Sequence, residues 1–158
     1  MIAVRFLRLS HAEGLPPPSR QSAEAAGLDL AAAVPVSEPR TLAPGERALI
    51  PTGFVIELPN GCEGQIRPRS GLALNSGVTV LNAPGTIDSD YRGEIGVLLI
   101  NLGDKPFVVS RGARIAQLVV GRVESAVLTE AENLMGTDRG EKGFGSTDMG
   151  RRVDLGER

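Results

Sequence analysis

Hydrophobic and polar residues alternate with a period of two in several short stretches of the chain. The alternation is clearest in Val4–Leu9 and Val55–Leu58, and it is typical of a strand with one buried face. Glycines also recur every eight or nine residues, at positions 45, 53 and 61, 77, 85 and 93, and 103, 112 and 121. This spacing indicates short antiparallel strands joined by tight turns. The pattern predicts an all-β domain, as a sandwich, barrel or jelly roll.

Between these glycines lie six stretches with the composition of strands: Arg47–Ile50, Phe54–Leu58, Val78–Leu81, Ile95–Asn101, Phe107–Val109 and Ile115–Val120. Two further stretches are candidates for helices, a single turn at Gly71–Asn75 and a longer segment at Glu124–Leu134. With four Phe, one Tyr and no Trp in the chain, we expect an aliphatic core.

The composition is that of an ordinary globular protein, and it limits the kinds of functional site that the chain can form. The chain has 158 residues, of which 41% are hydrophobic and 23% charged, so we expect one compact unit plus an arm. A formal net charge of −2 gives no sign of a basic nucleic-acid footprint. Cys62 and His11 are the one cysteine and the one histidine, which excludes an internal disulfide and a zinc site of His and Cys clusters. Any catalysis must therefore use carboxylates, arginines and hydroxyls, with or without a hard metal ion.

Membrane and targeting signals are weak throughout the sequence. No apolar run approaches the roughly 18 residues of a membrane span. Residues Met1–Leu9 alternate charged and apolar side chains instead of forming the apolar stretch of a signal peptide. We expect a cytoplasmic protein that binds neither membrane nor nucleic acid.

The stretch from Met135 to Arg158 differs from the rest. It carries six glycines with five basic and five acidic residues, too few apolar groups to order itself alone. A frayed tail is one interpretation. A mobile lid is the other, because Arg139 and Gly143–Thr147 combine phosphate-binding groups with one aromatic ring.

Residues Val78–Gly93 form the most informative motif. Pro84-Gly85 is typical of a type II turn, which predicts a hairpin whose arms end in Asn82 and Asp88. The backbone of such a hairpin offers N–H and C=O groups that can bind a flat heteroaromatic edge. In an extended chain Asp88 and Asp90 lie on the same side, either as a metal site or as a base and its partner. The alternative is an ordinary turn.

Three other stretches place polar groups where ligands could bind. In Arg67–Ala73, two arginines and Ser70 precede a possible helical turn, which is either an anion pocket or a solvated arginine pair. Asp29 interrupts the apolar stretch Ala26–Leu30, as a turn residue, a cap or an outer ligand of hydrated Mg²⁺. Gln117 lies in an apolar strand, where glutamine usually satisfies a neighbouring polar group.

Taken together, these segments resemble the trimeric dUTP pyrophosphatase family over almost the whole chain. Its five motifs occur in family order, as Ala26–Leu30, Pro68–Ala73, Gly85–Gly93, Arg114–Leu118 and Arg139–Thr147. The third and fifth are the specific ones. Two departures are visible: Ala113 stands where an acidic residue is common, and Asp148 follows Thr147 where a small residue is usual.

The resemblance implies a jelly-roll or distorted β-barrel fold of the dUTPase type. It also implies a homotrimer with shared active sites, in which residues 1–134 form the catalytic domain and residues 135–158 a flexible C-terminal arm. The reaction it implies converts dUTP and water to dUMP and pyrophosphate with Mg²⁺. This limits the incorporation of uracil into DNA and supplies dUMP for thymidylate synthesis.

Residue roles follow from the same resemblance. Asp88 is implied to be the catalytic base, and Asp29 to hold Mg²⁺ through water. The residues implied to bind phosphates are Arg69, Ser70, Gly71 and Gln117, with Arg139, Gly145, Ser146 and Thr147 from the arm. Those implied to bind the nucleoside are Asn82, Thr86, Ile87 and Gly96 at uracil, Tyr91 under the deoxyribose, and Phe144 stacked on the base.

Two alternatives remain open from the sequence. The first is a dCTP deaminase, or a bifunctional deaminase and pyrophosphatase, on the same fold. That chemistry needs a carboxylate near C4 of the base, and the deaminase family lacks the Gly-Phe-Gly-Ser arm seen at residues 143–146. The second is a nucleotide-binding module that keeps the fold without catalysis.

Overall fold

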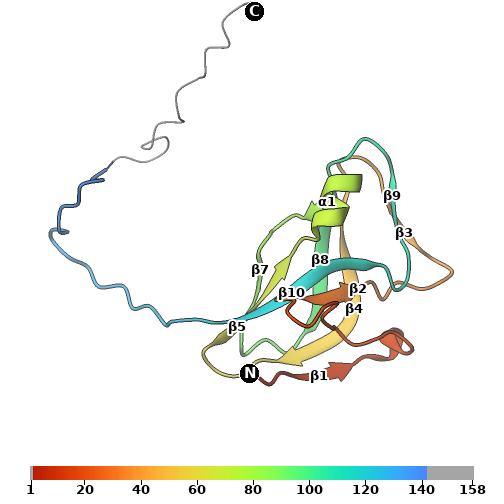
Figure 1. The fold of residues 1–158 in the computed structure, drawn as a ribbon, viewed down its shortest axis with the longest axis horizontal. Coiled ribbons are helices and arrows are strands. Elements are labelled where there is room, and N and C mark those ends of the chain that lie inside the picture. The colour runs from red at the N-terminus through yellow and green to blue at the C-terminus, as the bar shows by residue number, and fades with distance from the viewer. Residues whose placement is uncertain (1, 142–158) are drawn as a thin grey trace, which may run out of the picture. The chain divides into compact units, whose positions relative to one another are not determined.

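The computed structural model describes residues 2–141 of the chain. Its contacts divide the chain into two units, Met1–Ser125 and Ala126–Arg158. The first unit contains every regular element of the described residues (Figure 1). These are β1 (Arg5–Arg8), η1 (Ser10–Ala12), β2 (Leu28–Ala31), β3 (Arg40–Leu42), β4 (Arg47–Glu57), β5 (Cys62–Arg67), α1 (Ser70–Ser76), β6 (Val78–Val80), β7 (Gly85–Ile87), β8 (Glu94–Asn101), β9 (Phe107–Val109) and β10 (Arg114–Arg122).

Two four-stranded sheets build this unit, and all their pairings are antiparallel. The first sheet has the order β1-β4-β8-β6 and the second the order β2-β10-β5-β7, while β3 and β9 form a separate pair. Strands β6 and β7 therefore lie at the edges of different sheets. The prediction of an all-β fold is confirmed, and the helical turn expected at Gly71–Asn75 corresponds to α1.

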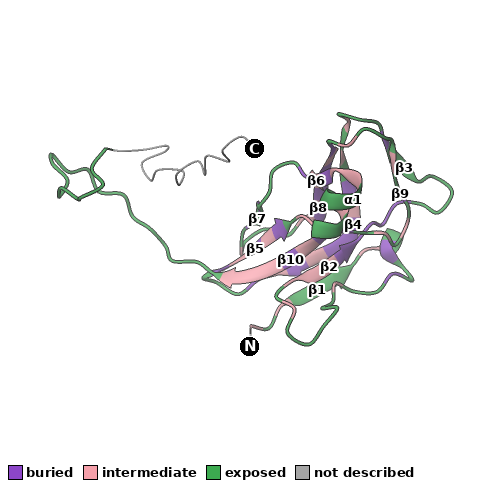
Figure 2. Cartoon of the chain, turned by 45° about the horizontal axis from the view of Figure 1, so that its top comes forward, coloured by how far each residue is buried: buried purple, intermediate pink, exposed green. Residues whose placement is uncertain are grey.

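The core lies between the inner faces of the two sheets. Along β8, buried Ile95, Val97 and Leu99 alternate with partly exposed neighbours, and Ile66 and Leu118 come from the second sheet. Figure 2 shows buried and partly buried stretches on the strands of both sheets. The core is aliphatic, as expected, because β-branched and leucine side chains fill a pleated surface without needing polar partners.

A second, smaller cluster fixes the N-terminal turn η1 against β4. It joins Ala12, Leu15, Ala33 and Phe54. Gly53 lies directly beneath the turn with φ of +73°, and a Cβ atom there would stand 2.2 Å from Cβ of Ala12. The approach of η1 to β4 thus requires glycine at this position.

The predicted division of residues 47–58 into two strands is wrong. Residues Arg47–Glu57 form one strand, β4, whose register against β8 shifts between Pro51 and Val55. The extra residues of this irregularity contain Gly53, which the sequence suggested as a turn. A bulge absorbs such residues without ending the strand.

The predicted hairpin at residues 78–88 is also wrong. Strand β6 pairs with β8 and strand β7 pairs with β5, so its two arms belong to different sheets. The turn lies earlier, where Ala83 N donates to Val80 O at 3.2 Å, and Gly85 begins β7 without the positive φ of a type II turn. Each arm pairs in the sheet where its buried side chains pack, and Asn82 lies at the crossing between them.

The candidate helix at Glu124–Leu134 does not form. Residues 126–141 are all exposed, with Val127 and Leu128 at 88% and 98% (Figure 2). A helix of this length needs an apolar face packed on other elements, and its own unit offers none within the described residues. Among residues 2–141 there is no helix of the length and apolar character that crossing a membrane requires. The functional division at residue 134 stays a prediction.

Candidate active site

A cleft opens at the edge of the sandwich, between β7 of one sheet and β8 of the other. Its volume is about 160 Å³. Six residues singled out from the sequence line this one cleft: Asn82, Thr86, Ile87, Asp88, Tyr91 and Gly96. The crossing, the edge strand β7 and the start of β8 bring them together.

The free edge of β7 provides the wall of the cleft. Among residues 2–141 this strand pairs with β5 alone, with Thr86 opposite Gln65. Its other edge therefore leaves backbone N–H and C=O groups available to a ligand. The Asn82 carboxamide packs on Gly85, where a Cβ atom would lie 3.1 Å from Nδ2 of Asn82. A planar base can meet alternating donors and acceptors here, although the hairpin expected from the sequence is absent.

Asp88 follows β7 directly and is exposed at the cleft. Its backbone O accepts from Tyr91 N at 3.1 Å, which closes a turn over residues 88–91. Within residues 2–141 its carboxylate carries no ion pair or side-chain hydrogen bond, so both oxygens are available to a water molecule. The pairing of Asp88 with Asp90 expected for an extended chain is wrong, because the chain turns here and Asp90 does not line the cleft.

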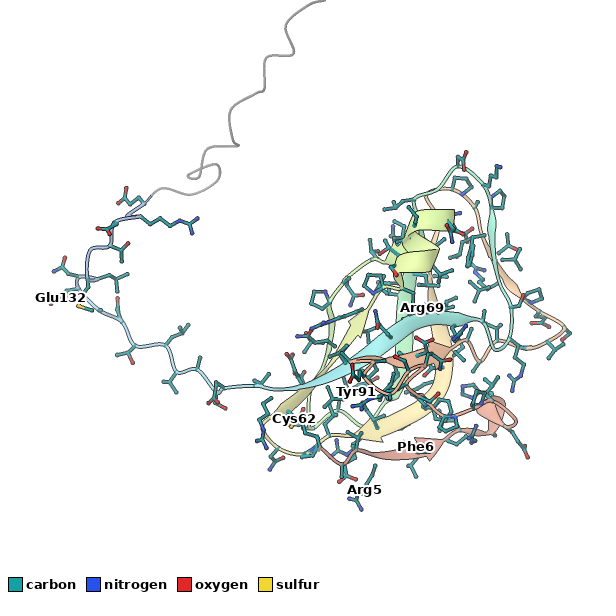
Figure 3. The ribbon with its side chains drawn as sticks, viewed as in Figure 1. Arg5, Phe6, Cys62, Arg69, Tyr91 and Glu132 are labelled. Carbon is teal, nitrogen blue, oxygen red and sulfur yellow. The ribbon has the colours of Figure 1, made fainter. Side chains whose placement is uncertain are left out.

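Tyr91 is anchored at its hydroxyl group. Oη donates to the backbone O of Glu94 at 3.0 Å, and a Cβ atom at Gly93 would lie 2.2 Å from that hydroxyl oxygen. Gly93 therefore gives the ring its room. The side chain is still 45% exposed and forms part of the cleft wall (labelled in Figure 3).

A second cluster lies on the outer face of the sheet that contains β2, β10 and β5. Gln117 stands between Asp29 and Arg67 in the strand register, and its Nε2 donates to Pro68 O at 3.0 Å. Asp29 lies 3.5 Å from Nε of Arg69 and 3.3 Å from Nη1 of Arg114. The arrangement holds guanidinium groups and one amide together at the surface (Arg69 is labelled in Figure 3).

The start of α1 adjoins this cluster. Arg69 is its N-cap residue and makes no side-chain capping bond, so Ser70 and Gly71 present their backbone N–H groups in the open first turn. Both residues are exposed. The predicted group of Arg69, Ser70, Gly71 and Gln117 is thus contiguous, next to Asp29.

The cleft and this cluster lie on opposite faces of β5. Ile66 lines the cleft, whereas its neighbour Arg67 points to the outer face beside Gln117. Successive side chains of a strand point to opposite sides, so the cleft and the outer cluster lie on different faces of this sheet.

Asp29 fits an outer role toward a metal ion better than a direct one. Both carboxylate oxygens face guanidinium groups and the side chain is 14% exposed. No group of three or more His, Cys, Asp or Glu side chains within residues 2–141 could hold a metal ion. Since Mg²⁺ usually keeps several waters and takes the rest of its ligands from phosphates, contact through water suits this residue.

Two residues beside the predicted ones were given no role from the sequence. Glu94 lines the cleft, and Arg114 joins Asp29 while also donating to Oε1 of Gln21 at 2.8 Å. The sequence around a glutamate at the start of a strand does not distinguish a site residue from an ordinary solvent-exposed one. Of the arm residues, Arg139 lies in the second unit, and Phe144, Gly145, Ser146 and Thr147 lie outside the described residues.

Comparison with known proteins matches this arrangement to one family. The dUTPase family model matches residues 14–148 of the chain. The chain belongs to the dUTPase family. Deoxyuridine 5'-triphosphate nucleotidohydrolase from Beijerinckia indica subsp. indica is 63% identical over 143 residues, which cover 90% of this chain and 89% of the relative. The enzyme of that name from Mesorhizobium japonicum is 60% identical over 144 residues, covering 91% and 89%.

The dUTPase fold is shared with solved structures at lower identity. The Staphylococcus bacteriophage 80alpha dUTPase with dUPNHPP is 26% identical, with a TM-score of 0.81 over 92% of this chain and 98% of that one. The resemblance to the dUTPase family drawn from the five motifs is thereby confirmed, together with its fold.

Proposed function

We propose that the protein hydrolyses dUTP to dUMP and pyrophosphate. This reaction removes dUTP from the precursors of DNA and supplies dUMP for thymidylate synthesis. The observation that carries the proposal is the cleft around which residues 82–91 place Asn82, Thr86, Ile87, Asp88 and Tyr91 opposite Gly96 of β8. Relatives about 60% identical over nine tenths of the chain bear the name of this activity.

Asp88 is the general base in this proposal. Its unpaired carboxylate accepts a proton from a water molecule, whose oxygen attacks the α-phosphorus in line. A bond forms between that oxygen and phosphorus, the bond to the β-phosphate oxygen breaks, and pyrophosphate leaves. A positioned base typically contributes about 10²–10⁴-fold to the rate.

The nucleoside is bound by the cleft. The free edge of β7 at Thr86 and Ile87, together with Asn82, hydrogen-bonds uracil, and Gly96 lines the pocket on β8. Tyr91 packs under the deoxyribose, where a 2'-hydroxyl would meet its ring. Phe144 of the arm stacks on the base, which suits the preference of aromatic rings for offset stacking.

The triphosphate is bound by a second copy of the chain. Arg69, Ser70, Gly71 and Gln117 of that copy face the cleft, while Arg139, Gly145, Ser146 and Thr147 close over the terminal phosphates. A homotrimer with shared sites satisfies this requirement, because a closed ring of three gives every cleft an outer cluster from a neighbour. The separation of cleft and cluster across β5 supports this assembly.

Magnesium completes the site in this proposal. The ion neutralises charge on the triphosphate when bound, and Asp29 holds its water ligands. The guanidinium groups of Arg69 and Arg114 fix the Asp29 carboxylate for this task. We further propose that the enzyme works in the cytoplasm, where dUTP arises.

A turnover assay with dUTP, dCTP and dTTP tests the proposal against its alternatives. Release of pyrophosphate from dUTP, with dCTP and dTTP poor substrates, is expected. The backbone groups of β7 and the Asn82 side chain that hydrogen-bond uracil leave a donor or acceptor unpaired against cytosine. An unpaired polar group in a closed site costs binding free energy. Release of ammonia from dCTP would instead identify a deaminase, and binding of dUTP without turnover a non-catalytic module.

A further inference from the structure

The N-terminal turn is connected to the wall of the cleft by a chain of hydrogen bonds. Nε2 of His11, on η1, lies 2.9 Å from Oε1 of Glu94. The backbone O of Glu94 is the acceptor that holds the Tyr91 hydroxyl at 3.0 Å. Because an ionised carboxylate only accepts, the imidazole N–H donates. The chain runs from the one histidine of the sequence to the one tyrosine.

One oxygen of the Glu94 carboxylate, Oε1, accepts two hydrogen bonds. Besides His11, Gly53 N donates to Oε1 of Glu94 at 2.6 Å. Gly53 is the residue over which η1 packs, with Ala12 against it. The turn, β4 and the first residue of β8 therefore form one connected unit behind Tyr91.

Two arginine side chains hold the backbone of the η1 turn. Arg111 Nη1 donates to the backbone O of His11 at 2.8 Å, and its Nη2 donates to Glu13 O at 2.8 Å. Arg8 Nη1 donates to Ala12 O at 3.0 Å. Three carbonyl groups of a short segment are thus held by two guanidinium groups, which fix the backbone that carries His11.

We propose that His11 is a positioning residue that sets, through Glu94, how strictly Tyr91 excludes a nucleotide with a 2'-hydroxyl. The proposal rests on the proposed function, in which Tyr91 contacts the deoxyribose. His11 touches neither the sugar nor the reacting phosphate. Removing its donor leaves Oε1 of Glu94 with the hydrogen bond from Gly53 N alone, so Glu94, whose backbone O anchors Tyr91, is held less firmly. A displaced ring admits the extra hydroxyl.

The test uses two amide substitutions that differ in reach. The Gln amide nitrogen can take the place of Nε2, whereas the Asn nitrogen corresponds to Nδ1 and falls short of Glu94. We expect the ratio of kcat/KM for dUTP to that for UTP to fall about tenfold in His11→Asn and to be preserved in His11→Gln. Ser10→Ala is the control on the same turn, since its side chain is exposed and makes no hydrogen bond within residues 2–141. The imidazole is 42% exposed, so both variants are expected to fold.

Tyrosine fluorescence gives a readout independent of turnover. With one Tyr and no Trp in the chain, the emission of nucleotide-free protein reports on Tyr91 alone. We expect a changed fluorescence lifetime in His11→Asn, and the wild-type value in His11→Gln and Ser10→Ala.

The outcomes separate this proposal from the proposed function. An unchanged selectivity ratio in His11→Asn overturns the role of His11, as does an equal loss of kcat/KM for dUTP and UTP or an unchanged lifetime. Wild-type protein that hydrolyses no dUTP overturns the proposed function and the selectivity claim with it. If the wild type prefers dUTP over UTP and this preference falls only in His11→Asn, the result supports both the role of His11 and the proposed function.

Discussion

Gly27 lies against the side chain of Gln117, so that a Cβ atom at position 27 would stand 2.3 Å from Oε1 of the carboxamide. The first and fourth motifs of the chain therefore meet in space, at a contact where a Cβ atom would displace the Gln117 carboxamide. The same carboxamide donates to Pro68 O from its other end. Gly27 thus orients Gln117 toward the outer cluster that we assign to phosphate binding.

We expect Gly27→Ala to weaken nucleotide binding without unfolding the protein. The added methyl displaces the end of a flexible side chain, not the backbone, so the structural cost is small. Loss of one oriented hydrogen bond to a charged phosphate should raise KM for dUTP roughly tenfold, with kcat changed less. Gly121→Ala, in β10 and facing open space, is the control for the same change of residue. A KM equal to that of the wild type would show that Gln117 does not bind substrate.

Asp88→Asn should abolish turnover and leave the dissociation constant for nucleotide within about tenfold of the wild type. The amide keeps the shape of the side chain and removes its basicity, so kcat should fall by at least about 100-fold. Asp90→Asn, in the same turn but away from the cleft, is the control and should retain activity. Retention of a tenth of the wild-type kcat would refute the assignment of Asp88 as the base.

Tyr91→Ala should relax the exclusion of UTP. The ring occupies the wall where a 2'-hydroxyl would project, and its removal leaves room for that group. The measurement is kcat/KM for dUTP and for UTP in both proteins. Equal values for the two nucleotides in the wild type would contradict the role of Tyr91 before any variant is made.

The pair of Arg5 and Glu57 should make stability depend on pH in the acid range. The hydrogen bond from Arg5, with the charges of Arg5 and Arg92, lowers the pKa of Glu57 below its usual range, against a smaller opposing effect of burial. A lowered pKa in the folded state means that the unfolded state binds more protons in the range between the two values. The stabilisation is therefore complete above the usual glutamate pKa and is lost as pH falls through the lower folded value.

Glu57→Gln tests this expectation through the apparent unfolding temperature. The difference from the wild type should be small, because both side chains are exposed, and it should vanish as pH falls. Glu38→Gln, at an exposed turn residue with no side-chain partner within residues 2–141, is the control. A difference that grows toward acid pH would reverse the sign and refute the argument.

Strand positions were largely predictable because they depend on local alternation. Phe107–Val109 coincides with β9, and β8 extends the predicted Ile95–Asn101 by one residue. Pairing was not predictable in the same way. Strands β6 and β7 are separated by four residues and still join different sheets, because long-range packing of their buried side chains outweighs a local turn signal.

The candidate site shows the same limit. Asn82, Asp88 and Tyr91 stood out because their motif is specific, and the structure places them around one cleft. His11 did not stand out, since a histidine in a polar stretch carries no local sign of a partner 83 residues away. The contact arises from Gly53 and the two arginines that fix the turn, and no periodicity encodes such an arrangement.

The last prediction concerns the origin of the arm that closes each site. If the arm acts on a cleft in another subunit, an Asp88→Asn chain and a chain truncated after Gly136 are both inactive alone. When the two are unfolded and refolded together, mixed trimers contain clefts with a working Asp88 from one chain and residues 139–147 from the other. Activity should reappear in proportion to the mixing statistics. An arm acting on its own chain's cleft leaves every site with one defect, so the mixture stays inactive.

The control is a mixture of Asp88→Asn chains with and without the arm, which should show no activity under either arrangement. Isolation of mixed trimers without recovered turnover would exclude the exchange of arms between subunits and leave closure within one chain.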